Sequence, residues 1–307
     1  MEERSLTREW RLPHPVGVGR LLLGRRRGAG DPTYRVEGVG ERARHWRGLV
    51  TPDGPATLVL HQEPDGTVHG EAWGPGARWA LDSVPGLLGQ YDDPSGFAPD
   101  HPVLAEAART AGEVRFGRSG LVMEALVPAV IEQRVTGQEA FAGFRRLVQR
   151  YGDRAPGPHE RLFVQPTAER LRRIPSWEWL RLPVDPARSR AVLTAARVAD
   201  SIERTVGLSG DEVERRLTTL PGIGVWTAAE VRQRAHGDPD AVSFGDYHVA
   251  KDVGWAIEGR PWDDEELAAF LEPFRPHRNR VVGLVYLARL RRPRRGPRMA
   301  PRTHLPR

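Results

Sequence analysis

The sequence contains no cysteine among its 307 residues, and this absence excludes several kinds of chemistry. Disulfide bonds, a cysteine nucleophile and a four-cysteine iron–sulfur cluster cannot form. The ten histidines show no HExxH motif or comparable close pairing, so we expect no metal site made from side chains. No apolar run approaches membrane-spanning length, and the first ten residues lack the apolar part of a signal peptide. We therefore expect a soluble, intracellular protein with no membrane partner.

Lysine is almost absent as well, because arginine outnumbers it 45 to 1 and the single lysine is Lys251. Residues 289–307 contain eight arginines and no acidic residue, and subtracting these from the net charge of +6 leaves residues 1–288 at −2. The folded part must therefore meet an anionic polymer through local patches rather than through an overall field. Residues 291–307 contain four prolines and no apolar periodicity, so we expect a disordered basic tail.

Residues 1–99 are predicted to form a small antiparallel sheet domain with helices. Two stretches fit short helices, 18–23 and 83–88. Glu63-Pro64-Asp65-Gly66 is a turn signal that joins two strands in a hairpin. Four stretches alternate or favour β-structure: 34–39, 43–50, 56–61 and 67–73.

Residues 100–290 are predicted to be all-helical. Asp100 is placed to cap a first helix, and Asp185-Pro186 begins a long amphipathic helix over 187–206. Asp263 and Glu266 have the spacing of a capping box. The predicted fold class is therefore α+β, with a sheet domain followed by a two-lobed helical domain that has a cleft between its lobes.

A glycine-rich turn, Leu-Pro-Gly-Ile-Gly at 220–224, separates two helical patterns. Gly222 and Gly224 leave backbone N–H groups uncovered at the start of the second helix, which is predicted over 225–236. The dipole of that helix favours an anion at its N-terminus, and a nucleic-acid phosphate is the natural ligand. The same pattern also fits an ordinary helical hairpin.

The loop after this hairpin ends in Asp246-Tyr247, and the combination resembles the helix-hairpin-helix DNA glycosylases. The run LPGIGVWTA followed by Asp-Tyr is most similar to the DNA-3-methyladenine glycosylase II type. The resemblance implies a base-excision-repair enzyme that hydrolyses the N-glycosidic bond of alkylated purines, such as 3-methyladenine and 7-methylguanine. It implies that Asp246 stabilises the oxocarbenium-like transition state and activates water. Asp246 also fits an N-cap of a helix over 247–257, and the two roles are compatible.

Trp226 occupies an informative position in this resemblance. Family members that also cut the strand carry a nucleophilic lysine two residues after the second hairpin glycine, and a Schiff base requires that amine. The tryptophan here implies a monofunctional hydrolase, in which the indole stacks on a flipped base. The alternative is that Trp226 is a packed core aromatic.

The predicted substrate pocket consists of Trp226, Tyr247 and Tyr286, because electron-rich rings attract a cationic alkylated base. Glu230 lies one helical turn after Trp226, where the relatives carry tyrosine. Its carboxylate would attract a cationic base or change the substrate, or it turns to solvent as helical glutamates usually do.

The resemblance also implies a set of DNA contacts. Arg134 falls where the alkylpurine enzymes carry a bulky apolar wedge, so the plug that fills the gap of the flipped base would be a guanidinium. The alternative is an ordinary exposed arginine at a helix end. The predicted DNA-binding residues are Gln133, Arg134, Gly222, Ile223, Gly224 and Arg278.

The resemblance implies no cofactor, and the one candidate ion is a monovalent cation on backbone carbonyls of the hairpin. The implied partner is double-stranded DNA that contains damaged bases, bound by a monomer in the cytoplasm and associated with the nucleoid. Two other interpretations stay open. One is a non-catalytic nucleic-acid-binding helix-hairpin-helix module, and the other is a glycosylase with altered lesion specificity.

Overall fold

The computed structural model describes residues 4–293. The predicted tail therefore lies outside the described residues apart from 291–293. Among the described residues, no helix is both long enough and apolar enough to cross a membrane.

One antiparallel sheet has the strand order β1-β5-β4-β3-β2. Its strands are β1 (Leu6–Trp10), β2 (Tyr34–Glu37), β3 (Arg44–Thr51), β4 (Gly54–Gln62) and β5 (Val68–Trp73). The four predicted strands and the turn at Glu63–Gly66 are confirmed. The first strand was not predicted from sequence. It pairs only with β5 at the sheet edge and is mostly exposed, so it lacks an apolar face that a sequence pattern could reveal.

Both faces of the sheet are covered. Helices α1 (Val18–Leu23) and α2 (Ala77–Leu87) pack on one face, and α2 is longer than the predicted helical turn at 83–88. The other face carries Trp46 and Trp73, and a connection from the helical part, which includes residues 155–164, covers it. Backbone bonds across this contact, such as Phe163 N–H to Pro32 O at 2.9 Å, attach the sheet to the helices.

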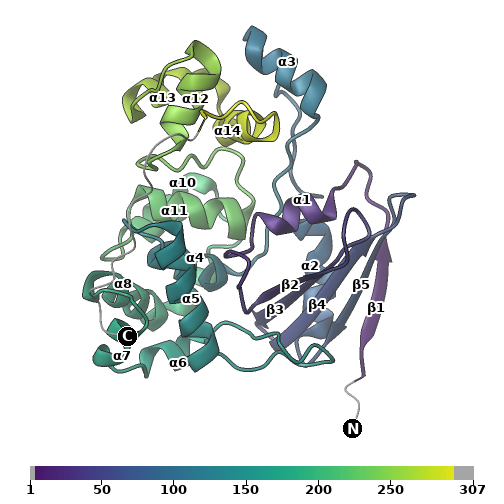
Figure 1. Ribbon diagram of the computed structural model, residues 1–307, viewed down its shortest axis with the longest axis vertical. Coiled ribbons are helices and arrows are strands. Elements are labelled where there is room, and N and C mark those ends of the chain that lie inside the picture. Colours follow the sequence, from purple (N-terminus) through teal and green to yellow (C-terminus); the bar gives the residue numbers. More distant parts are fainter. Residues whose placement is uncertain (1–3, 294–307) are drawn as a thin grey trace.

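The helical part has two cores. The first is built from α4 (Val122–Ile131), α5 (Gly137–Tyr151), α6 (Ala168–Arg172), α7 (Ser176–Arg181), α8 (Pro186–Arg197), α9 (Ala199–Glu203), α10 (Gly210–Thr218) and α11 (Val225–Val231), and α11 continues into a π-helical turn, Arg232–His236. The second is built from α3 (Pro102–Ala111), α12 (Val249–Glu258), α13 (Asp264–Leu271), a 3₁₀ turn (Glu272–Phe274) and α14 (Arg278–Leu287). Figure 1 shows α3 with α12–α14, although it precedes α4 in the sequence.

Local capping signals account for several helix starts. The Asp185 carboxylate accepts the N–H groups of Ala187 and Arg188, and Asp263 forms a complete capping box with Glu266. Both features were predicted.

Two predictions about helices were wrong. The cap at Asp100 is not formed, because α3 begins at Pro102 after His101, which makes no side-chain cap bond. The predicted helix 187–206 is broken at Val198, whose backbone (φ −117°, ψ 23°) leaves the helical region. The exposed Val198 is β-branched and loses side-chain freedom inside a helix. The residues of α9 still pack into the same core as those of α8.

Candidate active site

Packing against the first helical core fixes the hairpin between α10 and α11. Ile223 is buried in the first helical core, and its N–H bonds to Leu220 O at 3.0 Å. Gly222 has φ +87°, and an added Cβ would lie 2.7 Å from the Cβ of Ala191. Only glycine fits there. Nothing lies within 4 Å of a Cβ built on Gly224, so this glycine faces open space.

The start of α11 presents unpaired donors on that open side. Gly224, Val225 and Trp226 are the first residues of the helix and its cap, and within residues 4–293 no acceptor receives their N–H groups. Helix N-termini carry a partial positive charge and bind anions. The geometry therefore fits the predicted phosphate contact, through Gly224 and the residues after it rather than through the N–H of Ile223.

The turn between α4 and α5 braces this hairpin. The Nε2 group of Gln133 donates to Gly222 O at 2.9 Å and to Thr227 Oγ1 at 2.8 Å. Gln133 thus holds the hairpin in place, and its function as a DNA contact stays a prediction.

Arg134, the next residue in this turn, is exposed and has φ +54°. The left-handed region costs a residue with a Cβ about 1–2 kcal/mol. Within the described residues, its guanidinium has no ion pair and no hydrogen bond. An unpaired arginine on a strained turn beside the hairpin fits the predicted plug.

Asp246 lies in the loop between the π-helical turn and α12. Its Oδ1 accepts the N–H groups of His248 at 2.7 Å and Val249 at 3.2 Å. The predicted N-cap role was wrong, because residues 247 and 248 form a turn and α12 begins at Val249 with His248 as its cap, two residues after Asp246. Its Oδ2 has no donor within residues 4–293. Gly245, at φ +85°, donates its N–H to Asp264 Oδ2 at 2.9 Å and fixes the loop just before the carboxylate.

The three predicted pocket aromatics have different surroundings. Trp226 is half-buried, whereas Tyr247 is 68% exposed with the Lys251 ammonium 3.5 Å from its ring centroid. Burial raises the pKa of Tyr286, and Asp252 and Asp246 raise it further. Tyr286 is therefore protonated at neutral pH and lies within electrostatic range of Asp246.

Glu230 does not turn to solvent. It is buried, its Oε2 lies 2.5 Å from Arg234 Nη1, and its Oε1 accepts the Ser243 hydroxyl at 2.6 Å. Both carboxylate oxygens of Glu230 are bound by Arg234 and Ser243. No oxygen is therefore left free for the predicted attraction of a cationic base. Ser243 precedes Asp246 by three residues, and Glu230 thereby anchors the loop that carries Asp246.

Arg278 is also engaged within the protein. Its Nη2 lies 2.7 Å from Asp240 Oδ2, and its Nε donates to Oδ1 of the same carboxylate at 2.9 Å. A DNA contact by this side chain would have to share the guanidinium with Asp240.

A partly buried set of charges beside the site was not predicted from sequence, and we call it the joint. It connects the segment after α1 and strand β3 to α4, to α11 and to the π-helical turn that follows α11. Arg27 Nη1 lies 2.9 Å from Glu132 Oε1, and Arg25 Nη1 donates to Arg234 O at 2.9 Å. The members of the joint are Arg25, Arg27, Arg47, Glu124, Glu132, Glu230 and Arg234. Arg27 and Glu132 are 105 residues apart, and Arg25 and Arg234 are 209 residues apart, so no local sequence signal reveals these contacts.

No protein-family model matches the sequence. Among curated proteins, the probable bifunctional transcriptional activator/DNA repair enzyme AlkA of Mycobacterium tuberculosis is 33% identical over 167 residues, which are 52% of this chain. The match spans 33% of that relative, so the chain covers about a third of the length of the curated relatives it matches.

Solved structures match over nearly the whole chain. The 3-methyladenine DNA-glycosylase from Archaeoglobus fulgidus superposes with a TM-score of 0.73 at 17% identity, over 92% of this chain and 98% of that one. The chain has the fold of the helix-hairpin-helix DNA glycosylases. The resemblance predicted from the hairpin and Asp246 is confirmed at this level.

The glycosylase fold is shared by enzymes that act in different ways. The 8-oxoguanine glycosylase/lyase of Clostridium acetobutylicum, solved with double-stranded DNA, matches with a TM-score of 0.67 at 12% identity, over 94% of this chain and 99% of that one. Since the fold accommodates both a glycosylase and a glycosylase/lyase, the reaction has to be argued from the site residues.

Proposed function

We propose that this protein is a monofunctional DNA glycosylase that removes alkylated purines from double-stranded DNA by hydrolysis. The observation that carries the proposal is the Asp246 carboxylate, which is held at the start of α12 by one oxygen and has the other oxygen free. The names of two similar proteins, a DNA repair enzyme and a 3-methyladenine DNA-glycosylase, support the same reaction.

DNA binding would begin at the hairpin. The unpaired N–H groups from Gly224 onward would receive a phosphate, and the missing side chain at Gly224 lets the DNA backbone approach closely. This contact positions the duplex without reading its sequence.

Base removal requires the nucleotide to leave the stack. Arg134, exposed and unpaired at the α4–α5 turn, would enter the duplex and stack on the bases that remain. Its guanidinium would add an attraction to neighbouring phosphates that an apolar wedge cannot provide.

The C1′–N bond between sugar and base would then break, with its electron pair moving to the base. An alkylated purine is cationic, so the electrons of the C1′–N bond neutralise it as it leaves, and no strong general acid is required. Trp226, Tyr247 and Tyr286 would hold the cationic ring by stacking and cation–π attraction. Asp246 would stabilise the positive sugar and accept a proton from the water whose oxygen bonds to C1′.

The absence of a lysine near the hairpin supports hydrolysis over strand cleavage. Trp226 stands where a Schiff-base amine would be required. The single lysine, Lys251, lies on α12 with its ammonium against the face of Tyr247.

The test is to incubate the protein with methylated duplex DNA and to separate the products by chromatography. We expect free 3-methyladenine and 7-methylguanine, intact abasic strands, and no protein–DNA adduct after borohydride treatment. An adduct through Lys251 or the N-terminal amine would contradict the monofunctional assignment. Binding without release of any base would favour a non-catalytic module. Preferential release of neutral hypoxanthine would favour altered lesion specificity.

A further inference from the structure

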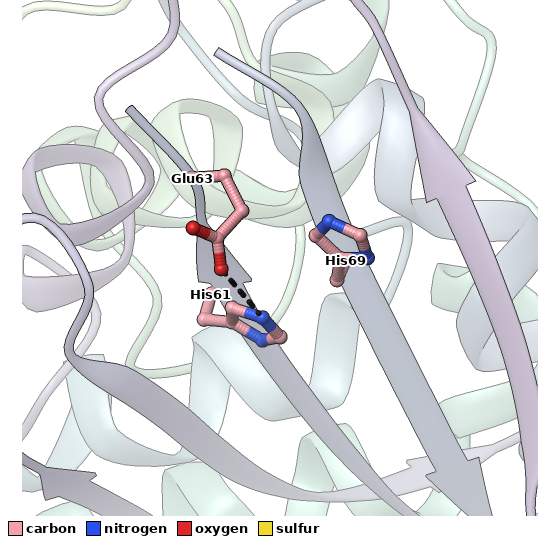
Figure 2. A group of neighbouring side chains, drawn as sticks. All are labelled: His61, Glu63 and His69. Carbon is pink, nitrogen blue, oxygen red and sulfur yellow. Dashed lines mark ion pairs between the residues drawn. The ribbon is translucent and has the colours of Figure 1, made fainter. Parts of the chain in front are cut away.

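A second group of chemically capable side chains lies on the sheet, away from the hairpin. His61 on β4 and His69 on β5 are directly opposite each other in the antiparallel register, and Glu9 on β1 is opposite His69. Glu63 follows His61 by two residues and therefore projects from the same side of the chain. Figure 2 shows His61 and His69 on neighbouring strands, with Glu63 just beyond the end of β4.

The distances suit a shared ion. One ligand atom from each of His61, Glu63 and His69 lies within 4.8 Å of the others. The His61 Nε2 and Glu63 Oε1 atoms are 3.6 Å apart, which is too long for a good hydrogen bond. Two ligands of a tetrahedral zinc ion, at bond lengths near 2.1 Å, lie roughly 3.4 Å apart.

Glu9 completes the arrangement from the edge strand. Its Oε1 lies 3.0 Å from Nδ1 of His69. Histidine ligands of metals usually donate their second ring N–H to a carboxylate, which fixes the tautomer and directs the other nitrogen to the ion. Within residues 4–293, Nε2 of His69 has no other partner.

We propose that His61, His69 and Glu63 bind one divalent transition-metal ion of the zinc type, with Glu9 orienting His69. Two imidazoles and one carboxylate form a borderline ligand set that suits Zn²⁺ better than Ca²⁺ or Mg²⁺. All four side chains are partly exposed, so an ion and a water ligand can enter from solvent. The prediction of no metal site rested on spacing along the chain, whereas this group forms only through strand register.

The ion would tie together three strands at one end of the sheet. Because β1 pairs only with β5, the Glu9–His69 contact would connect the bound ion to the edge strand. Arg42 Nε lies 3.8 Å from Glu63 Oε2 in an exposed pair, and it can turn to solvent when the ion enters. This proposal is independent of the proposed glycosylase activity.

The test is calorimetric titration of ZnCl₂ into the full chain, purified without a histidine tag and stripped with a chelator. We expect one zinc ion per chain and a rise in the unfolding temperature with zinc concentration. His61→Ala and His69→Ala should each weaken the affinity by more than about 100-fold, because loss of an outer partner alone typically costs about 10–100-fold. Glu63→Gln should weaken it similarly, and Glu9→Gln by about 10-fold.

Glu71→Gln is the matched control, since it removes one carboxylate from the same side of β5 and should leave the affinity unchanged. Near-ultraviolet circular dichroism checks that each variant is folded. The proposal is overturned if the wild type shows no saturable binding of one ion. Binding by the folded His61→Ala and His69→Ala variants at wild-type affinity would also overturn it.

Discussion

The candidate site residues and the joint differ in how their polar groups are paired. Among the candidate site residues Arg134, Gly224, Trp226 and Asp246, a guanidinium, several N–H groups and a carboxylate oxygen have no partner among the described residues. In the joint, Arg27, Arg47 and Arg234 each form an ion pair with a glutamate, and Arg25 donates to backbone carbonyls.

Hydrogen bonds connect the two regions, because Glu230 of the joint accepts the hydroxyl of Ser243, three residues before Asp246. A buried charge without a partner is very costly, so the glutamates of the joint are paired with arginines, although Glu124 Oε2 and Arg234 Nε form no hydrogen bond within the described residues. Open donors and acceptors at a surface are tolerated, and they are available to a ligand. The comparison therefore separates residues that hold the site from residues that we propose to act in it.

The largest expected effect tests the joint. Glu230→Ala leaves Arg234, whose side chain is 22% exposed, without its ion-pair partner and should lower the free energy of unfolding by about 3 kcal/mol, measured by chemical denaturation. Glu169→Ala is the control, because it breaks an exposed i,i+4 pair with Arg173 and should cost about 0.5 kcal/mol or less. Equal small losses in both variants would remove the distinction between the joint and an ordinary surface.

The same pair predicts a pH dependence. Burial acts to raise the pKa of Glu230, but Arg234, the Ser243 hydrogen bond and Arg27 together lower it below the ordinary glutamate value. At pH values above the ordinary pKa of glutamate, the ionised Glu230 therefore stabilises the folded protein. This stabilisation is lost as the pH falls through the lowered pKa of Glu230. The stability difference between wild type and Glu230→Gln should shrink on acidification.

The two hairpin glycines allow the same comparison within a single turn, because Gly222 packs against Ala191 whereas Gly224 faces open space. Gly222→Ala places a Cβ 2.7 Å from Ala191 in a left-handed conformation and should lower the free energy of unfolding by about 1–3 kcal/mol. Gly224→Ala meets no neighbour and should cost less than about 1 kcal/mol, yet weaken DNA binding. Denaturation and binding measured on both variants check this. Unchanged DNA affinity in Gly224→Ala would argue against a phosphate at the start of α11.

Trp226→Ala should lower base release by about 1–3 kcal/mol in transition-state free energy if the lost term is base stacking. Trp177→Ala, which removes a tryptophan that is 64% exposed on α7, should leave base release unchanged. Single-turnover rates on methylated DNA measure both. Equal rates in both variants would assign Trp226 to packing.

The smallest effect is expected at Arg134. Arg134→Gly relieves a left-handed backbone and should retain or raise stability, by up to about 1 kcal/mol. If the arginine is the plug, the same variant should nevertheless release bases more slowly. A parallel loss of stability and activity would indicate a structural arginine.

Much of the fold follows from local sequence signals. Capping pairs such as Asp263 with Glu266 act over one turn, and they placed helix starts correctly. Strand β1 was missed because an exposed edge strand has no buried face. The break at Val198 was missed because the apolar residues of α8 and α9 pack into the same core, so the apolar pattern continues across the break.

The candidate site divides in the same way. Asp246 and the hairpin glycines lie in one continuous stretch, so their combination is visible in the sequence. The burial of Glu230 depends on Ser243 and on Arg27, and the His61–His69 pair depends on strand register. Contacts of this kind become visible only when the chain is folded.

The central claim concerns the two carboxylate oxygens of Asp246. One accepts hydrogen bonds from the backbone at the start of α12, and we propose that the other acts in the reaction. Asp246→Asn retains a side-chain oxygen that can accept the N–H groups of His248 and Val249, but it removes the negative charge. The most direct measurement is the single-turnover rate of 3-methyladenine release by this variant, together with its unfolding temperature and DNA affinity. We predict that base release falls at least about 100-fold while stability and binding stay near those of the wild type. Wild-type-like release by a folded Asp246→Asn protein would contradict the account.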